Sequence, residues 1–130
     1  MESMKSALNA YQTVQVDAAV LGASPHELIA KLFAKAIESV RVARAAMLNG
    51  DIEAKSQHIK IAISIISDGL HSSLNMEAGG ELAENLDALY TYMVQRLMKA
   101  HIDNDAAIFD EVALLLGEIK SGWDGIKDKL

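Results

Sequence analysis

Cysteine is absent from this chain of 130 residues, and proline occurs once. Without thiols the chain has neither a disulfide framework nor a cysteine nucleophile, and its composition fits a reducing compartment. Aromatic residues make up only 5% of a sequence that is 51% hydrophobic, so aliphatic side chains and alanine must fill the core. This length is enough for one domain with a single well-buried core.

Positive charge is also scarce, since 18 acidic residues oppose 12 basic ones and the net charge is −6. Nucleic acids and anionic membranes attract clustered lysine and arginine, so we expect no nucleic acid as a partner. The best apolar run, residues 61–67, is far shorter than the ~20 residues that a membrane span needs. The amino terminus lacks the apolar core of a signal peptide, so we expect a cytoplasmic protein without membrane insertion.

Apolar residues recur at helical spacing through most of the chain, and strand signals are absent. Ser24, Pro25 and Glu27 form a capping box that begins the first helix. Turns centred on glycine and asparagine or aspartate separate helices expected over residues 25–48, 52–74, 81–101 and 105–121. Four such helices with short connections predict an all-α fold, an antiparallel four-helix bundle of up-down-up-down type.

Two regions are expected along the chain. Residues 1–23 are weakly patterned and predict an N-terminal arm, extended or partly helical, that is mobile unless docked. Residues 24–130 form the bundle domain, with Trp123 just beyond the last helix.

The second helix carries more apolar surface than one core-facing stripe needs. At about 100° per residue its main stripe consists of Ile59, Ala62, Ile63, Ile66, Leu70 and Leu74. Ile61 and Ile65 lie roughly 150° away from this stripe, and Gly69 one turn further has no side chain to cover them. A second apolar set also broadens the third helix, and it consists of Ala83, Tyr90, Val94 and Met98.

Two interpretations of this surplus remain open. Either the second helix is central and buries both stripes inside the bundle, or a groove accepts an amphipathic helix from a partner. In the second case each large side chain contributes ~1.5–3 kcal/mol when it is fully removed from water. The candidate partner-binding residues of the bundle are Ile61, Ile65, Tyr90, Val94 and Met98. Tyr11 and Val14 then fold over the groove in the free protein, unless the arm is a tail without a role.

Metal and phosphotransfer patterns are missing. A di-iron bundle needs Glu-x-x-His on two helices, whereas the nearest match, Asp68 to His71, is single and has an aspartate. We interpret that pair as solvated. Neither His58 nor His71 is followed by the lysine and glycine of a phosphotransfer site, so all four histidines are interpreted as surface residues.

Other catalytic patterns are missing as well. The sequence has no serine-nucleophile elbow and no glycine-rich phosphate loop. Neighbouring carboxylates, such as Glu81 with Glu84 and Asp110 with Glu111, are interpreted as solvated helix faces. We therefore expect no enzyme, no metal site and no cofactor.

Several short motifs follow one another in a fixed order, namely Ala10-Tyr11-Gln12, Ala23-Ser24-Pro25, Glu27-Leu28-Ile29, Ile65-Ile66 before Leu70, Gly79-Gly80-Glu81-Leu82-Ala83, Asn85-Leu86, Leu89-Tyr90, Tyr92-Met93 and Trp123. With these motifs the chain resembles the flagellar export chaperone family FliS. Each is weak alone, but the ordered set is specific and covers about residues 10–126. One departure is the segment 32–36, Leu-Phe-Ala-Lys-Ala, where the family usually has Leu-Tyr-Asp-Gly-Ala.

The resemblance implies a cytoplasmic chaperone for flagellin, the partner that it delivers to the flagellar type III export apparatus. Such chaperones bind the disordered carboxy-terminal segment of flagellin in grooves of the bundle, which prevents premature polymerisation and keeps flagellin competent for export. The arm, including the position of Tyr11, is implied to lie over part of the site. The alternative is a regulatory or self-associating bundle, a homodimer when unliganded, that masks another export substrate such as an anti-sigma factor.

Overall fold

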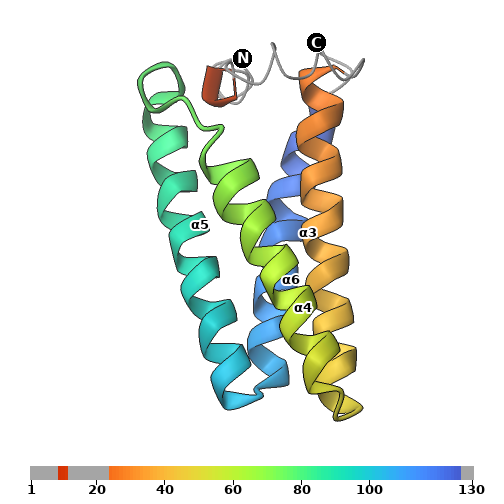
Figure 1. The fold of residues 1–130 in the computed structure, drawn as a ribbon. Coiled ribbons are helices and arrows are strands. Elements are labelled where there is room, and N and C mark those ends of the chain that lie inside the picture. The colour runs from red at the N-terminus through yellow and green to blue at the C-terminus, as the bar shows by residue number, and fades with distance from the viewer. Residues whose placement is uncertain (1–8, 12–23, 127–130) are drawn as a thin grey trace.

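A computed structural model describes residues 9–11 and 24–126, which form a bundle of four antiparallel helices (Figure 1). The helices are α3 (Pro25–Leu48), α4 (Ile52–Ser64), α5 (Met76–Asp103) and α6 (Ala106–Gly125), and a π-helical segment, η1 (Ile65–His71), continues α4. Successive helices run in opposite directions, and no strand occurs among the described residues. The predicted all-α, up-down-up-down bundle is confirmed.

Capping residues determine where the helices begin. The Ser24 hydroxyl accepts a hydrogen bond from the Glu27 N–H at 3.1 Å, and the Asp51 carboxylate accepts one from the Ala54 N–H at 3.0 Å. Gly50 has a φ of 75°, in the left-handed region that favours glycine, so the chain can reverse between α3 and α4. These are the signals from which the first two helices were predicted.

Three predicted helix boundaries are wrong. The second helix was expected to reach residue 74, but α4 ends at Ser64 and η1 ends at His71. The third begins at Met76 rather than residue 81, because Asn75 accepts the Ala78 N–H at 2.9 Å; the expected break falls inside it, at Gly80 with a φ of 57°. The fourth continues to Gly125 and so contains Trp123, whose side chain is buried.

The core lies along α3, which packs against both α4 and α6, while α5 contacts α4, η1 and α6. The fully buried residues of α3 include several small ones, namely Ala36, Ser39 and Ala43, which let neighbouring backbones approach closely. Gly69 of η1 also faces α3, because a Cβ there would lie 3.4 Å from the Leu32 side chain. Leu32 thus occupies the side of η1 where Gly69 has no side chain of its own.

Ala10 and Tyr11 of the arm are buried against the upper end of the bundle, where α3 begins and α6 ends (Figure 1). The Ala10 carbonyl accepts the Asn75 N–H at 2.7 Å. A Cβ at Gly79 would lie 2.9 Å from the Ala10 Cα, so this docking requires glycine there. The remainder of the predicted arm, including Val14, lies outside the described residues.

Candidate binding cleft

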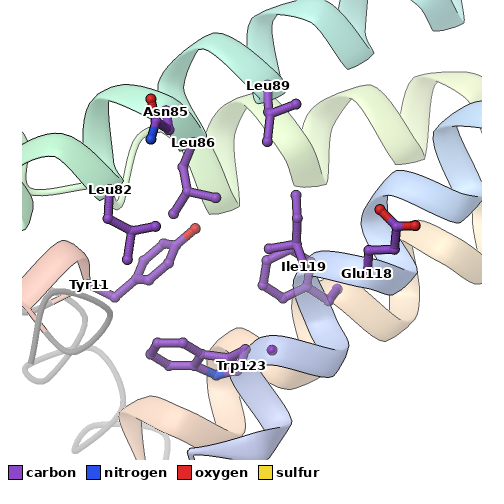
Figure 2. Close-up of a pocket in the computed structure, with 10 residues that line it drawn as sticks. Tyr11, Leu82, Asn85, Leu86, Leu89, Glu118, Ile119 and Trp123 are labelled. Carbon is purple, nitrogen blue, oxygen red and sulfur yellow. The ribbon is translucent and has the colours of Figure 1, made fainter. Parts of the chain in front are cut away.

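An apolar cleft of about 300 Å³ opens between the upper halves of α5 and α6 (Figure 2). It is lined by Tyr11, Phe33, Leu82, Asn85, Leu86, Leu89, Glu118, Ile119, Gly122 and Trp123. Figure 2 shows the Tyr11 ring reaching from the arm between the leucines of α5 and Trp123. Apolar side chains dominate this lining, so the cleft suits an apolar guest better than a charged one.

Tyr11 is held in the cleft by a hydrogen bond between its hydroxyl and that of Tyr90. Both side chains are buried, and burial raises the pKa of each phenol far above its ordinary value. Proximity to Tyr90 raises the Tyr11 pKa further. The hydrogen bond therefore joins two neutral phenols at physiological pH, and breaking it would leave a buried hydroxyl unsatisfied.

Trp123 forms the floor of the cleft, and its orientation is determined by His26. The two rings stack with centroids 5.0 Å apart, while the Tyr11 ring meets the indole edge-on at 5.4 Å. The Trp123 Nε1 donates to the His26 carbonyl at 3.0 Å, and the His26 Nε2 donates to the Trp123 carbonyl at 2.7 Å. Since His26 is only 6% exposed, its interpretation as a surface histidine is wrong.

Below the cleft, three polar side chains join α5 to α6. The Tyr92 hydroxyl donates to Glu111 Oε2 at 2.6 Å, and the Arg96 Nε donates to Glu111 Oε1 at 2.7 Å. These two hydrogen bonds lower the pKa of the Glu111 carboxyl. We call this group the α5–α6 clasp (Tyr92, Arg96 and Glu111). Glu111 is thus an interhelix partner whose side chain is still 35% exposed, so the prediction of a solvated carboxylate omitted only its two partners.

The other predicted polar residues also find partners. Asp110 is ion-paired with Arg44 of α3 at 2.9 Å. His71 does not pair with Asp68 as expected; its Nε2 lies against the Asp87 carboxylate of α5. The reason is that η1 turns the imidazole toward α5, so the sequence neighbours do not face each other.

Ile61 of α4 and Ile65 of η1 lie on one side of these two continuous segments. Both are half-buried, and Ile65 packs against the core. It precedes Gly69 by one turn, and Gly69 faces Leu32, which places Ile65 toward α3.

Val94 and Met98 belong to α5 and lie at its seam with α4, on the side of α4 opposite Ile61 and Ile65. The Ser56 hydroxyl lies 3.3 Å from His101 Nε2, which marks the face of α5 that looks toward α4. Met98 and Val94 precede His101 by about one and two turns, and they share that face. The two predicted pairs therefore form separate surfaces, and the structure does not bring them into one groove.

Tyr90 was a candidate for a surface groove, but its side chain is fully buried. The sequence reasoning missed most of the cleft, because its leucines, Ile119 and Trp123 were assigned to core stripes or left outside the helices. One available signal was the pairing of a tyrosine in the arm with a lone tryptophan near the end of the chain.

The residues that the structure describes include no group of three or more histidine, aspartate or glutamate side chains that could hold a metal ion. None of the helices within residues 24–126 is both long enough and apolar enough to cross a membrane.

Comparison with known proteins gives consistent matches over most of the chain. The family model described as "Flagellar protein FliS" matches residues 7–130. Flagellar secretion chaperone FliSB of Pseudomonas aeruginosa is 48% identical over 126 residues, covering 97% of this chain and 98% of the relative. Flagellar secretion chaperone FliS of Salmonella typhimurium is 44% identical, and the match covers 95% of this chain and 92% of the relative. Flagellar secretion chaperone FliS of Bacillus subtilis is 31% identical, and the match covers 93% of this chain and 86% of the relative.

Proposed function

The chain belongs to the FliS family of flagellar secretion chaperones, and we propose that it binds the carboxy-terminal segment of flagellin before export. The observation that carries the proposal is the apolar cleft between α5 and α6, which Tyr11 enters from the described part of the arm. A disordered segment that folds as an amphipathic helix is the kind of guest that fits such a groove.

The arm occupies part of the proposed site in the free protein. Tyr11 lies where an apolar anchor of the guest would enter, between the leucines of α5 and Trp123. Displacing Tyr11 breaks its bond with Tyr90 and exposes Tyr90 to the guest, which accounts for a buried tyrosine among the expected binding residues. Val14 lies outside the described residues, and we propose that it takes part in binding because it follows Tyr11 in the chain.

Further apolar surface supports contacts outside the cleft. On α5, Met98 is 55% exposed and Ile102 is 78% exposed, and Val94 continues this stripe upward. Ile61 and Ile65 offer a second patch on the far side of α4. We propose that the flagellin segment wraps around the bundle and contacts these surfaces as well as the cleft.

Binding of this kind prevents premature polymerisation by occupying a segment that flagellin needs in the filament. The guest orders on binding, and the entropy cost of ordering moderates the affinity. Moderate affinity suits a cytoplasmic chaperone that must release flagellin at the export apparatus. The chemistry requires no cofactor, because apolar burial supplies the binding free energy.

Filling the cleft tests the proposal. Gly122 lines the cleft, and a Cβ there would meet nothing within 4 Å, so Gly122→Leu places a side chain in the path of the guest. Gly117 lies on the same helix with equally open space but does not line the cleft, which makes Gly117→Leu a matched control. We expect Gly122→Leu to weaken binding of a flagellin carboxy-terminal peptide at least about tenfold in calorimetry, and Gly117→Leu to leave it unchanged.

The outcomes separate the two function classes. Equal affinities for both variants and the unsubstituted protein would show that the cleft does not hold flagellin. If the unsubstituted protein binds no flagellin peptide and forms a homodimer on size exclusion, the self-associating alternative replaces the proposal. Circular dichroism verifies that both variants keep the bundle, which is expected because replacing a helical glycine favours the helix.

A further inference from the structure

The α5–α6 clasp lies directly below the cleft on the same face of α5. Leu82 and Leu89 line the cleft seven residues apart, a rise of about 10 Å, so the cleft holds about two turns of a guest helix. Tyr92 follows Leu89 by one turn, and its hydroxyl already donates to Glu111 across the seam. A guest that continued straight down the seam would meet the clasp at once.

The clasp is a poor surface for an apolar guest. Its carboxylate accepts two hydrogen bonds, and the Arg96 guanidinium also lies 5.9 Å from the centre of the Tyr92 ring. Covering this charged group with apolar side chains would remove its remaining water without supplying a new partner. Ending the apolar contact above Tyr92 avoids that cost.

An alternative path exists on the other side of α5. Val94, Met98 and Ile102 are spaced by four residues and form a stripe on the α4 side that begins just below the level of Leu89. Met98 and Ile102 are more than half exposed, and Ile102 is the most exposed of the large apolar residues in the part of the chain that the structure describes. The end of the cleft and the start of this stripe thus lie at neighbouring levels of α5, on different sides of the helix.

We propose that the α5–α6 clasp deflects the guest, so that the flagellin segment leaves the cleft at Tyr92 and crosses α5 onto the Val94–Met98–Ile102 stripe. This inference rests on the proposed function. Glu111 and its two partners are positioning residues, because they determine the path of the guest without forming its apolar contacts.

A double-mutant cycle tests the deflection. Ile102→Asp places a charge in the stripe, and Glu111→Ala removes the acceptor that holds the clasp together. We expect Ile102→Asp to weaken binding of a flagellin carboxy-terminal peptide about tenfold in the unsubstituted protein but only about twofold alongside Glu111→Ala, since an opened seam lets the guest run straight. Calorimetry measures both values.

Asp110→Ala is the matched control, because Asp110 is the adjacent carboxylate of α6 but pairs with α3. Its cycle with Ile102→Asp should be additive, as expected for substitutions without shared partners. Tyr92→Phe removes only one of the two hydrogen bonds and should give an intermediate coupling. Thermal unfolding of each variant shows whether the bundle itself is destabilised. The milder Tyr92→Phe variant shows whether the coupling follows the number of clasp hydrogen bonds.

Failure of the deflection and failure of the proposed function give different results. If Ile102→Asp weakens binding equally with and without Glu111→Ala, the clasp does not steer the guest, although the proposed function stands. If Gly122→Leu and Ile102→Asp both leave binding unchanged in the unsubstituted background, flagellin does not use these surfaces. The proposed function then fails, and the deflection fails with it.

Discussion

Two regions of the bundle, the α3 side and the α5–α6 seam, differ in how closely their helices approach. Along α3, which packs against α4 and α6, small buried residues such as Ala36, Ser39 and Ala43 allow close contact. Between the upper halves of α5 and α6, large residues such as Leu82, Leu89 and Ile119 face each other across a cleft. The size of the residues at the seam, more than their apolarity, separates a closed interface from an open one.

Under the proposed function, this difference assigns stability and binding to two regions of one small protein. The α3 side buries its apolar surface within the chain, which stabilises the bundle whether or not a guest is present. The α5–α6 side leaves apolar surface that one aromatic ring of the arm fills only in part. A chaperone needs both regions, since a guest site that is fully satisfied from within has nothing left to offer.

Removing volume should affect the two regions very differently. Phe109 is fully buried beside Val40 and Ala113, so we expect Phe109→Ala to lower the free energy of unfolding by about 3–5 kcal/mol. Leu89 lines the cleft and is only half-buried, so Leu89→Ala should cost about 1 kcal/mol. Urea denaturation followed by circular dichroism measures both. Equal costs would mean that the α5–α6 seam is as tightly packed as the α3 side.

Adding volume should destabilise the α3 side but not the α5–α6 cleft. Ala43 is fully buried in α3, and Ala43→Leu should destabilise the bundle by about 1–3 kcal/mol through overpacking. Gly122→Leu has open space around it and should leave the unfolding free energy unchanged or raise it by about 0.5–1 kcal/mol. The same urea titrations decide. A stabilising Ala43→Leu would reveal a void beside α3 and remove the distinction.

Much of the fold could be predicted from sequence because its signals are local. The capping box at Ser24 and the turn at Gly50 act within a few residues, and they placed the first two helix starts correctly. The family resemblance was also confirmed, because it rested on motifs spread over the chain. The end of α6 was wrong because it depends on a distant partner. Trp123 extends α6 by bonding His26 at the start of α3, and no local pattern contains that information.

The site was harder to predict because helical periodicity gives the angle of a residue but not its neighbour. Ile65 and Met98 both stand off the main stripe, yet one faces α3 and the other belongs to the α5 side of the bundle. Leu89 fits a core stripe and nevertheless lines the cleft, because the opposing helix stands further away there. Their roles as guest contacts stay predictions.

The smallest expected effect concerns the Tyr11 ring, which lies in the α5–α6 cleft. Tyr11→Phe leaves the Tyr90 hydroxyl buried without its partner and should cost about 1 kcal/mol in unfolding free energy, whereas the double variant with Tyr90→Phe should recover most of it. In the unsubstituted protein both pKa values are raised on folding, so above about pH 10 the unfolded chain binds fewer protons and stability falls as pH rises. Below that pH these two phenols are neutral in both states and contribute no pH dependence.

Trp123 is the single tryptophan of the chain, and its ring lies 5.4 Å from that of Tyr11, so its fluorescence reports whether the arm is docked. We expect the emission to shift toward longer wavelength above pH 10 in the unsubstituted protein, as the departing phenol admits water to the indole. The Tyr11→Phe, Tyr90→Phe double variant should lose this transition and keep only the weaker alkaline dependence of unfolding that Tyr92 contributes, because the hydrogen bond to Glu111 also raises the Tyr92 pKa. A transition of unchanged size in the double variant would mean that the Tyr11 phenol does not hold the arm in the cleft. The α5–α6 cleft would then be accessible in the free protein as well.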